Sequence, residues 1–172
     1  MRYFTKELSS RMNSCDESVR VQAEYEWKQN MRRYEDELEK VKKHLSSFFF
    51  KEYMQRQEFH DCYIEKISFL RERDKYRCEI YLYDGVENFY LTLLDVKRIQ
   101  LGVISLENCV AGKLAWVYSE LDWTNKRTIL LLIDCGPENE LQFECKEIKF
   151  SMMSKRSPRC NSFRKHKTLF GK

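Results

Sequence analysis

The chain has 172 residues, of which 42% are hydrophobic and 14% aromatic, with only five glycines and two prolines. This apolar content is enough for a core, so a wholly disordered chain is excluded, and the length suits one domain with an appended arm. The formal net charge is +4, yet residues 151–172 carry seven Lys or Arg and no Asp or Glu. The remaining body is mildly acidic, which argues against a body that binds nucleic acid.

Seven cysteines are present, an odd number, and no two have the C-x-x-C spacing. This usage argues against a disulfide framework and against a zinc finger. The N-terminus has no apolar leader segment, and no stretch approaches 18 uninterrupted apolar residues. The sequence therefore predicts a cytoplasmic protein with reduced thiols, no cofactor, no bound metal and no membrane contact.

The N-terminal third is helical in its pattern. Residues 1–12 favour a short helix after Thr5, and Ser14-Cys15-Asp16-Glu17 has the S-x-x-E form of a capping box. A helix of about 30 residues, roughly 45 Å long, follows. Its apolar face repeats every three or four residues, at Val19, Ala23, Trp27, Met31, Tyr34, Leu38, Val41 and Leu45. Packing on a sheet explains this face, and pairing with a second copy or a partner helix is the alternative. Residues 48–54 predict a short further helix.

From Phe59 onward the periodicity changes to two, which is typical of strands. Six strands are predicted, at residues 62–70, 76–83, 89–99, 116–123, 127–135 and 141–150. Short turns between most of them favour antiparallel neighbours. The expected fold class is α+β: N-terminal helices, one of them long, followed by a six-stranded antiparallel β-sheet meander. We divide the chain into a helical segment (1–58), the sheet of the same domain (59–151, with an irregular loop at 101–115) and a basic, flexible tail (152–172).

The common nucleotide-binding and hydrolase motifs are missing from the sequence, so no catalytic residue is assigned and an enzyme is disfavoured. The junction of helix and sheet carries His60 beside Asp61. One interpretation combines this pair with Glu120 or Cys62 in a metal or acid–base site. The other is structural: His60 binds a backbone carbonyl and Asp61 fixes the turn. Because adjacent strand residues point to opposite faces, joint ligation of one ion would need a bend there.

Aromatic residues are spread over three of the predicted strands, and alternation places Trp116, Tyr118 and Glu120 on one face. If these residues form a core and its rim, packing alone explains them. On an outward face they would form a recognition surface, because Trp and Tyr dominate binding hot spots. The candidate binding residues are His60, Asp61, Tyr81, Tyr83, Trp116, Tyr118, Glu120 and Trp123.

Several short motifs over residues 1–150 resemble those of a family of uncharacterised proteins from Gram-positive bacteria. The motifs are Tyr3-Phe4-Thr5-Lys6-Glu7 with the charged helix after it, Phe59-His60-Asp61 with Ile64, Trp116-x-Tyr118-x-Glu120, and Ile148-x-Phe150. The resemblance implies a domain of helices plus an antiparallel sheet with no assigned activity. Related sheet domains look like immunity proteins of bacterial toxin systems, which bind and block a partner.

The favoured interpretation is a bacterial or phage-borne binding protein without catalysis, which sequesters or inhibits a protein partner as an immunity or anti-defence factor does. The alternative is a small-ligand or nucleotide-binding domain, or a weak metal-dependent hydrolase, built around His60 and Asp61. Nucleic acid is expected to contact only the basic tail. A homodimer through the long helix is a further expectation.

Overall fold

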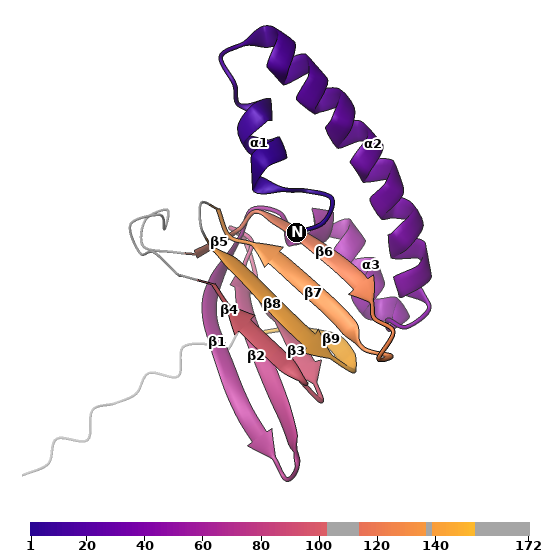
Figure 1. Cartoon of the computed structure of the whole chain (residues 1–172). Coiled ribbons are helices and arrows are strands. Elements are labelled where there is room, and N and C mark those ends of the chain that lie inside the picture. The colour runs from indigo at the N-terminus through magenta and orange to yellow at the C-terminus, as the bar shows by residue number, and fades with distance from the viewer. Residues whose placement is uncertain (103–113, 137–138, 154–172) are drawn as a thin grey trace, which may run out of the picture.

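The computed structural model describes residues 1–102, 114–136 and 139–153 and confirms the α+β class, with helices first and antiparallel strands after them (Figure 1). The helical elements are α1 (Lys6–Met12), α2 (Glu17–Lys42), α3 (Ser47–Gln55) and the one-turn segment η1 (Gln57–Phe59). The strands are β1 (Cys62–Glu72), β2 (Lys75–Tyr83), β3 (Asn88–Leu94), β4 (Arg98–Leu101), β5 (Leu114–Trp116), β6 (Tyr118–Trp123), β7 (Ile129–Asp134), β8 (Glu140–Cys145) and β9 (Glu147–Met152). The predicted tail from residue 154 on, and residues 103–113 of the predicted loop, lie outside the described residues.

Helix α2 has 26 residues and is about 39 Å long, somewhat shorter than predicted. Its N-cap is Asp16, whose carboxylate accepts hydrogen bonds from the backbone N–H groups of Ser18 (2.8 Å) and Val19 (3.4 Å). The capping box predicted from Ser14 is therefore wrong by two residues. A carboxylate both satisfies the free N–H groups and complements the positive end of the helix, and the Ser14 hydroxyl instead accepts from the Asp16 N–H.

The described residues form nine strands in two sheets, so the predicted count of six strands in one sheet is wrong. Three of the predicted long strands are each divided between two sheets: residues 89–99 give β3 and β4, residues 116–123 give β5 and β6, and residues 141–150 give β8 and β9. One sheet has the order β5-β1-β2-β3-β9 and the other β4-β8-β7-β6, with antiparallel pairs throughout. Since the divided strands run from one sheet into the other, the pairing closes into a ring and is not a simple meander. Where two sheets pack at an angle, strands that pass from one sheet to the other form the corners around a shared core.

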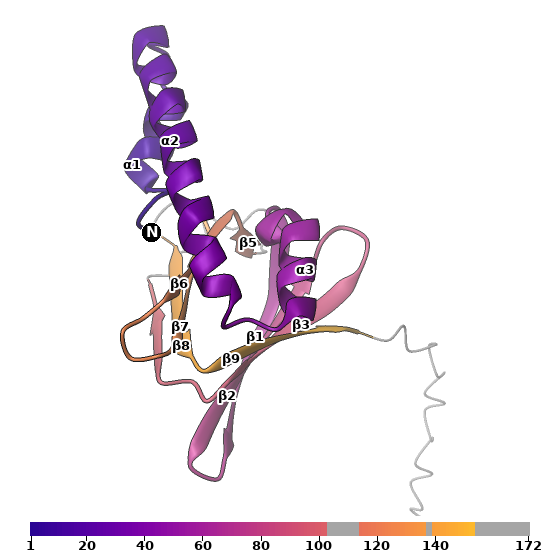
Figure 2. The ribbon, with the colours of Figure 1, turned by 90° about the vertical axis from the view of Figure 1, so that its right-hand side faces the viewer.

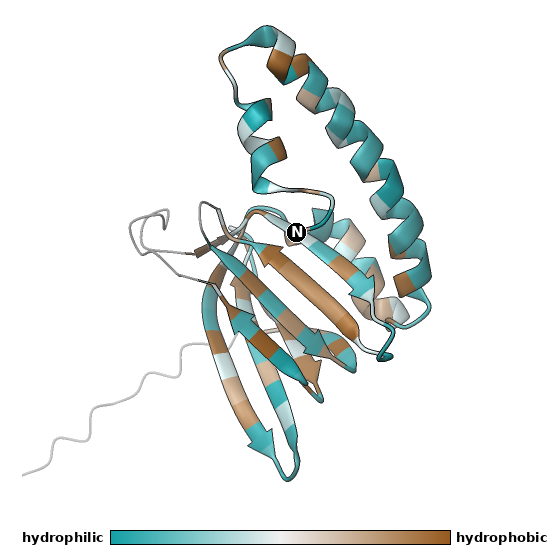
Figure 3. Ribbon diagram, viewed as in Figure 1, coloured by the Kyte–Doolittle hydropathy of each residue, from teal (hydrophilic) through white to brown (hydrophobic). Residues whose placement is uncertain are grey.

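One hydrophobic core lies between the two sheets and draws on both of them. Strand β7, in the interior of the second sheet, is apolar along most of its length (Figure 3). Helix α3 covers one end of the space between the sheets (Figure 2), and η1, which follows it, contacts β6. Phe59 anchors this cover, because its buried ring lies 5.5 Å from that of Phe89, 5.6 Å from Trp116 and 6.2 Å from Phe150, measured between centroids.

Helix α2 lies against β6 with its C-terminal half, and its first turns, up to Glu26, stand clear of both sheets with α1 beside them (Figures 1 and 2). We call residues 6–26 the helical arm. Leu8 and Ala23 are its buried apolar residues. Arg11 pairs with Glu26 across the two helices, with 2.8 Å between Nη1 and Oε2. The arm is thus held together by its own contacts.

Five cysteines lie in the described part of the chain, namely Cys15, Cys62, Cys78, Cys135 and Cys145, and all of them are free thiols. Among the described helices, none combines the length and the apolar character needed to cross a membrane.

Candidate functional site

The connection between α3 and β1 has an unusual backbone. Gln57, Glu58, Phe59 and Asp61 all have positive φ angles, of 50°, 59°, 63° and 64°. None is glycine, and such a conformation costs an L-residue about 1–2 kcal/mol. The burial of Phe59 in the core offsets part of this cost. Because strain of this kind concentrates at binding and catalytic sites, residues 56–62, here called the junction, are the first candidate region.

The junction brings the two predicted site residues His60 and Asp61 into contact, with 2.9 Å between His60 Nδ1 and Asp61 Oδ2. The positive φ of Asp61 supplies the bend that this pairing needs, so the two side chains do not point to opposite faces here. The Asp61 N–H donates to the Trp116 carbonyl (3.0 Å), which ties the bend to β5. The His60 ring meets that of Tyr118 edge to face at 5.1 Å. Asp61 is exposed and His60 half-buried, so the pair lies at the surface.

A cleft of about 440 Å³ lies beside His60. It is lined by Glu52, Gln55, Arg56, Gln57, His60, Cys62, Asp84 and Val86. The guanidinium of Arg56 pairs with Asp84, with Glu52 (Nε to Oε2, 3.3 Å) and with Glu87 (Nη2 to Oε2, 3.2 Å). Burial raises the pKa of the Cys62 thiol to about 12, so this thiol stays protonated. The cleft therefore holds neither a free cation at Arg56 nor a reactive thiolate at Cys62.

Behind the cleft, three buried hydroxyls form a chain of hydrogen bonds. Tyr34 Oη accepts from the Leu121 N–H (2.9 Å), Tyr34 and Tyr53 Oη lie 3.2 Å apart, and Tyr53 Oη lies 2.9 Å from Ser119 Oγ. Ser119 Oγ donates to the Glu58 carbonyl (3.1 Å). Because the Ser119 hydroxyl donates to a carbonyl, the Tyr53 hydroxyl must donate to Ser119 and the Tyr34 hydroxyl to Tyr53. Each hydroxyl therefore donates once and accepts once. The chain joins α2, α3 and β6 to the junction.

The side chain of Glu58 is half-buried on the same turn. Burial, and then the neighbouring charges of Glu35 and Glu120, raise the pKa of Glu58 to about 7. A carboxyl with such a pKa changes its charge near neutral pH. In the described part of the chain, no group of three or more His, Cys, Asp or Glu side chains could hold a metal ion.

Glu120, predicted as a partner of His60 and Asp61, instead holds the segment before α1. Its carboxylate accepts from the backbone N–H groups of Arg2 (2.7 Å), Tyr3 (2.7 Å) and Phe4 (2.9 Å), and the residue is only 3% exposed. Three N–H donors satisfy a buried carboxylate well, so this side chain is committed to the fold.

The predicted aromatic surface does not assemble as one face. Trp116 is fully buried in the core, whereas Tyr118 lies outside it, against the rings of Phe4 (6.1 Å) and Trp27 (5.0 Å). The prediction that Trp116 and Tyr118 share a face is therefore wrong. Val117 lies between them, where the strand passes from one sheet to the other, and its N–H donates to the Asp134 carbonyl (2.8 Å).

The remaining aromatic candidates lie on separate elements. Trp123 stacks on His44 at the end of β6, with 3.6 Å between ring centroids and an interplanar angle of 5°. Tyr81 stacks on Tyr90 of the neighbouring strand β3 at 5.5 Å. The Tyr83 hydroxyl donates to the Gly85 carbonyl (2.6 Å) in the turn after β2.

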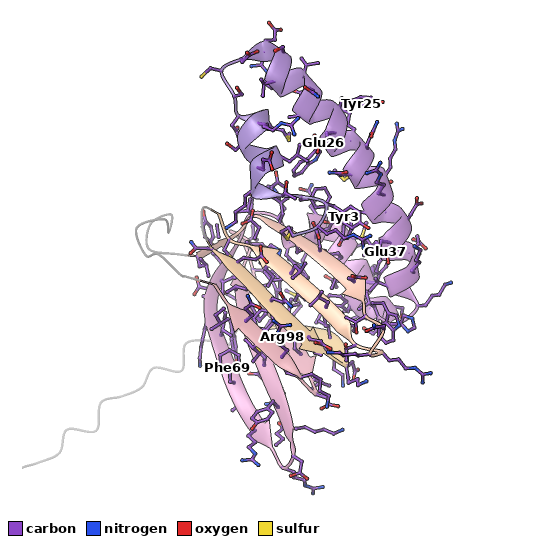
Figure 4. All side chains as sticks on the ribbon, in the orientation of Figure 1. Tyr3, Tyr25, Glu26, Glu37, Phe69 and Arg98 are labelled. Atoms are coloured by element: carbon purple, nitrogen blue, oxygen red, sulfur yellow. The ribbon has the colours of Figure 1, made fainter. Side chains whose placement is uncertain are left out.

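A second candidate region is the outward side of the helical arm, which the apolar stripe in the sequence did not indicate. Val21 is 57% exposed and Tyr25 64% exposed. Tyr25 lies on the side of α2 away from α1, whereas Glu26 lies toward α1 (Figure 4). The spacing of four residues between Val21 and Tyr25 was a usable signal, because it places both on one helix face outside the stripe. Glu58 gave no such signal, since its neighbours Glu35 and Glu120 are remote in sequence.

Comparison of the chain with protein families, with curated proteins and with solved structures gives no match. The functional argument therefore depends on the geometry described above.

Proposed function

We propose that this protein binds a protein partner through the outward side of its helical arm. The observation that carries the proposal is the exposure of Val21 and Tyr25 on an arm that stands clear of the sheets and is packed internally by Leu8 and Ala23. Tyr is among the residue types in which binding hot spots are enriched, and the exposed Val21 beside it adds apolar area that a partner could bury. The arm presents these residues far from the core, where their burial adds nothing to the fold of the chain itself.

The charges next to this pair indicate the chemistry of the partner. Lys28 and Arg32 follow Val21 and Tyr25 on the same helix face, one and two turns further along α2. Neither forms an ion pair with any described residue of the chain. The surface we propose for the partner is therefore apolar at its centre and acidic on the side that meets these two cations.

Inhibition or sequestration of the partner is the finer part of the proposal. It is supported by the resemblance of the opening, His60-Asp61 and Trp116-to-Glu120 motifs to a family whose related sheet domains look like immunity proteins.

The test is site-specific cross-linking followed by affinity measurement. A photo-reactive amino acid replaces Tyr25 in the full chain, and a matched control carries it at Lys51, an exposed residue of α3. We expect one protein to be cross-linked from position 25 and not from position 51. With that protein purified, we expect Tyr25→Ala and Val21→Asp each to raise the Kd at least tenfold and Lys51→Ala to leave it unchanged.

Two results would overturn the proposal. One is equal cross-linking from both positions, or a Kd that neither arm variant changes. The other is cross-linking of a second copy of this chain only, with a dimer in sedimentation analysis, because the arm would then be a self-association surface.

A second candidate function is the binding of a small ligand beside His60, which the cleft of about 440 Å³ favours. Catalysis by the His60–Asp61 pair, as in a weak hydrolase, would belong to this cleft. Its test is a screen of small metabolites by thermal unfolding, with His60→Ala as the variant and His44→Ala as the control. A ligand that stabilises the unchanged protein and the His44 variant but not the His60 variant would support this candidate, and equal stabilisation of all three would contradict it.

A further inference from the structure

The strongest feature that the proposed function does not use is a basic cleft on the sheets, distant from the outward side of the arm. It has a volume of about 460 Å³ and is lined by Lys97, Arg98, Lys126, Thr128, Glu144 and Lys146. These residues come from the β3–β4 connection and the start of β4, from the β6–β7 turn, and from the end of β8 with the corner that follows it. Arg98 lies on the front sheet, well away from Tyr25 on the arm (Figure 4).

Among the described residues, three of the four cations form no ion pair with a carboxylate. The fourth, Lys97, is paired with Asp95, at 2.6 Å between Nζ and Oδ1. Arg98 donates from Nη2 to the Gln100 side-chain carbonyl (3.0 Å), and the Lys146 ammonium donates to the Arg127 backbone carbonyl (3.0 Å). Both acceptors are neutral, so they orient the cations without cancelling them. The Lys126 ammonium has no hydrogen bond or ion pair with any described residue.

The remaining lining residues, Thr128 and Glu144, are both buried. The Thr128 hydroxyl donates to Glu144 Oε1 at 2.7 Å. Glu144 is the single carboxylate among the six lining residues, so the lining carries four positive charges against one negative. A concave site with this imbalance concentrates anions.

The geometry points to a binding site for the phosphate groups of a small phosphorylated molecule. Phosphate carries up to two negative charges and several acceptor oxygens. These match the guanidinium fork of Arg98 and the ammonium groups of Lys126 and Lys146, which line one cleft. The volume suits a small molecule. The neutral acceptors that orient Arg98 and Lys146 leave further N–H donors for such a ligand.

A nucleic-acid strand is the less favoured occupant. Strand binding needs cations along a track with aromatic side chains for stacking. The adjoining cleft, which shares Lys146 and holds the exposed Tyr76, is lined by as many acidic as basic residues: Glu72, Asp95 and Glu147 against Lys75, Arg77 and Lys146. In the direction of this adjoining cleft, the excess of positive charge therefore does not continue among the described residues.

Calorimetric titration of the full chain with pyrophosphate at low ionic strength tests the proposal. We expect saturable 1:1 binding that Arg98→Gln and Lys126→Gln each weaken at least fivefold. Lys51→Gln, a matched control at an exposed cation on α3, should leave the Kd unchanged. Glu144→Gln should tighten binding severalfold, because it removes the only negative charge of the lining while the amide oxygen still accepts from Thr128. Circular dichroism and thermal unfolding verify that each variant is folded.

A parallel titration uses a phosphorylated sugar and a single-stranded oligonucleotide. Tighter binding of the sugar phosphate than of pyrophosphate would support a site for a phosphorylated metabolite, and the reverse would support one for a free phosphate anion. The proposal is overturned if pyrophosphate does not saturate the protein, if Lys51→Gln weakens binding as much as Lys126→Gln, or if the oligonucleotide binds more tightly with a steep salt dependence.

Discussion

The junction and the helical arm differ in how their side chains are used. At the junction, Phe59 fills the core and the guanidinium of Arg56 pairs with three carboxylates. On the arm, Val21 and Tyr25 are exposed although they are apolar and aromatic. Backbone strain and a raised pKa therefore occur where the side chains already serve the fold. The exposed apolar surface of the arm occurs where the sequence carries no motif.

This contrast changes how the sequence motif at His60 and Asp61 is interpreted. The pair sits on a turn whose four positive φ angles are fixed by packing and by the bond from Asp61 N–H to Trp116. The geometry of the turn is enough to explain why His60 and Asp61 occupy these positions, and no ligand is needed for that explanation. Substitutions at the two regions should separate accordingly, with large stability effects at the junction and small ones on the arm.

The largest expected effect is at the anchor of the junction. Phe59→Ala should lower the free energy of unfolding by about 3–5 kcal/mol, because it removes a fully buried ring and leaves a cavity among three other aromatic rings. Urea denaturation followed by fluorescence measures it, with the exposed Phe48→Ala as control. A loss below about 1 kcal/mol would mean that the junction is not part of the core.

Glu120→Gln should lower the free energy of unfolding by about 2–3 kcal/mol. The amide replaces a carboxylate that accepts three N–H bonds, and its NH₂ group cannot accept any of them. Hydrogen exchange should report faster exchange of the Arg2, Tyr3 and Phe4 amides. Glu39→Gln, at an exposed residue whose partner is Lys42, is the control and should change little. Unchanged exchange rates would contradict this assignment of Glu120.

Glu58→Gln tests the pH dependence. The pKa of Glu58 is raised from 4.5 to about 7 in the folded protein, so its protonated form is favoured by folding. Its contribution to stability is complete below about pH 4.5 and is lost as the pH rises through 7. The variant should therefore be more stable than the unchanged protein by about 1–2 kcal/mol at pH 8, after allowance for partial exposure, and nearly equal at pH 4.5. A difference that does not vary between these two pH values would rule out Glu58 as the titrating group.

Gln57→Gly tests the strain. Glycine adopts a φ of 50° without the steric cost that glutamine carries, and the Gln57 side chain is exposed. The variant should be more stable by about 0.5–1 kcal/mol in thermal unfolding. Lys51→Gly, at an exposed position in the middle of α3, is the control and should be destabilised by a similar amount. Destabilisation of both would indicate that the left-handed turn is not strained.

The smallest effect is expected on the arm, where Tyr25→Ala should change the free energy of unfolding by less than about 0.5 kcal/mol because the side chain is exposed. Leu8→Ala, at the buried contact of the same arm, should cost about 2–3 kcal/mol. A loss at Tyr25 as large as that at Leu8 would show that the outward side of the arm serves the fold instead of a partner.

The fold class and most element positions could be predicted, because the apolar stripe of α2 and the alternation after Phe59 are local patterns. The division of the long strands between two sheets could not be predicted, because it depends on which strands pair with each other. Residues 116–123 alternate as one strand, but their pairing with β1 at Trp116 and with β7 from Tyr118 separates them into two sheets.

The candidate sites were predicted only in part. His60 and Asp61 could be placed at the junction from their position between the helical and strand patterns. The raised pKa of Glu58 and the basic cleft could not be predicted, because the charged residues that create them come from segments that are remote in sequence. Such sites are properties of the assembled sheets, not of a local motif.

The closed ring of strands has a consequence for the kinetics of folding. The two pairings that join the most distant segments are those of Cys62 with Trp116 and of Phe89 with Met152. Neither can form until a long loop has closed, whereas the β1–β2 hairpin needs only a short turn. We expect a slow folding reaction whose rate falls when Trp116 or Phe150 is truncated, while the hairpin forms early and has little influence on the rate.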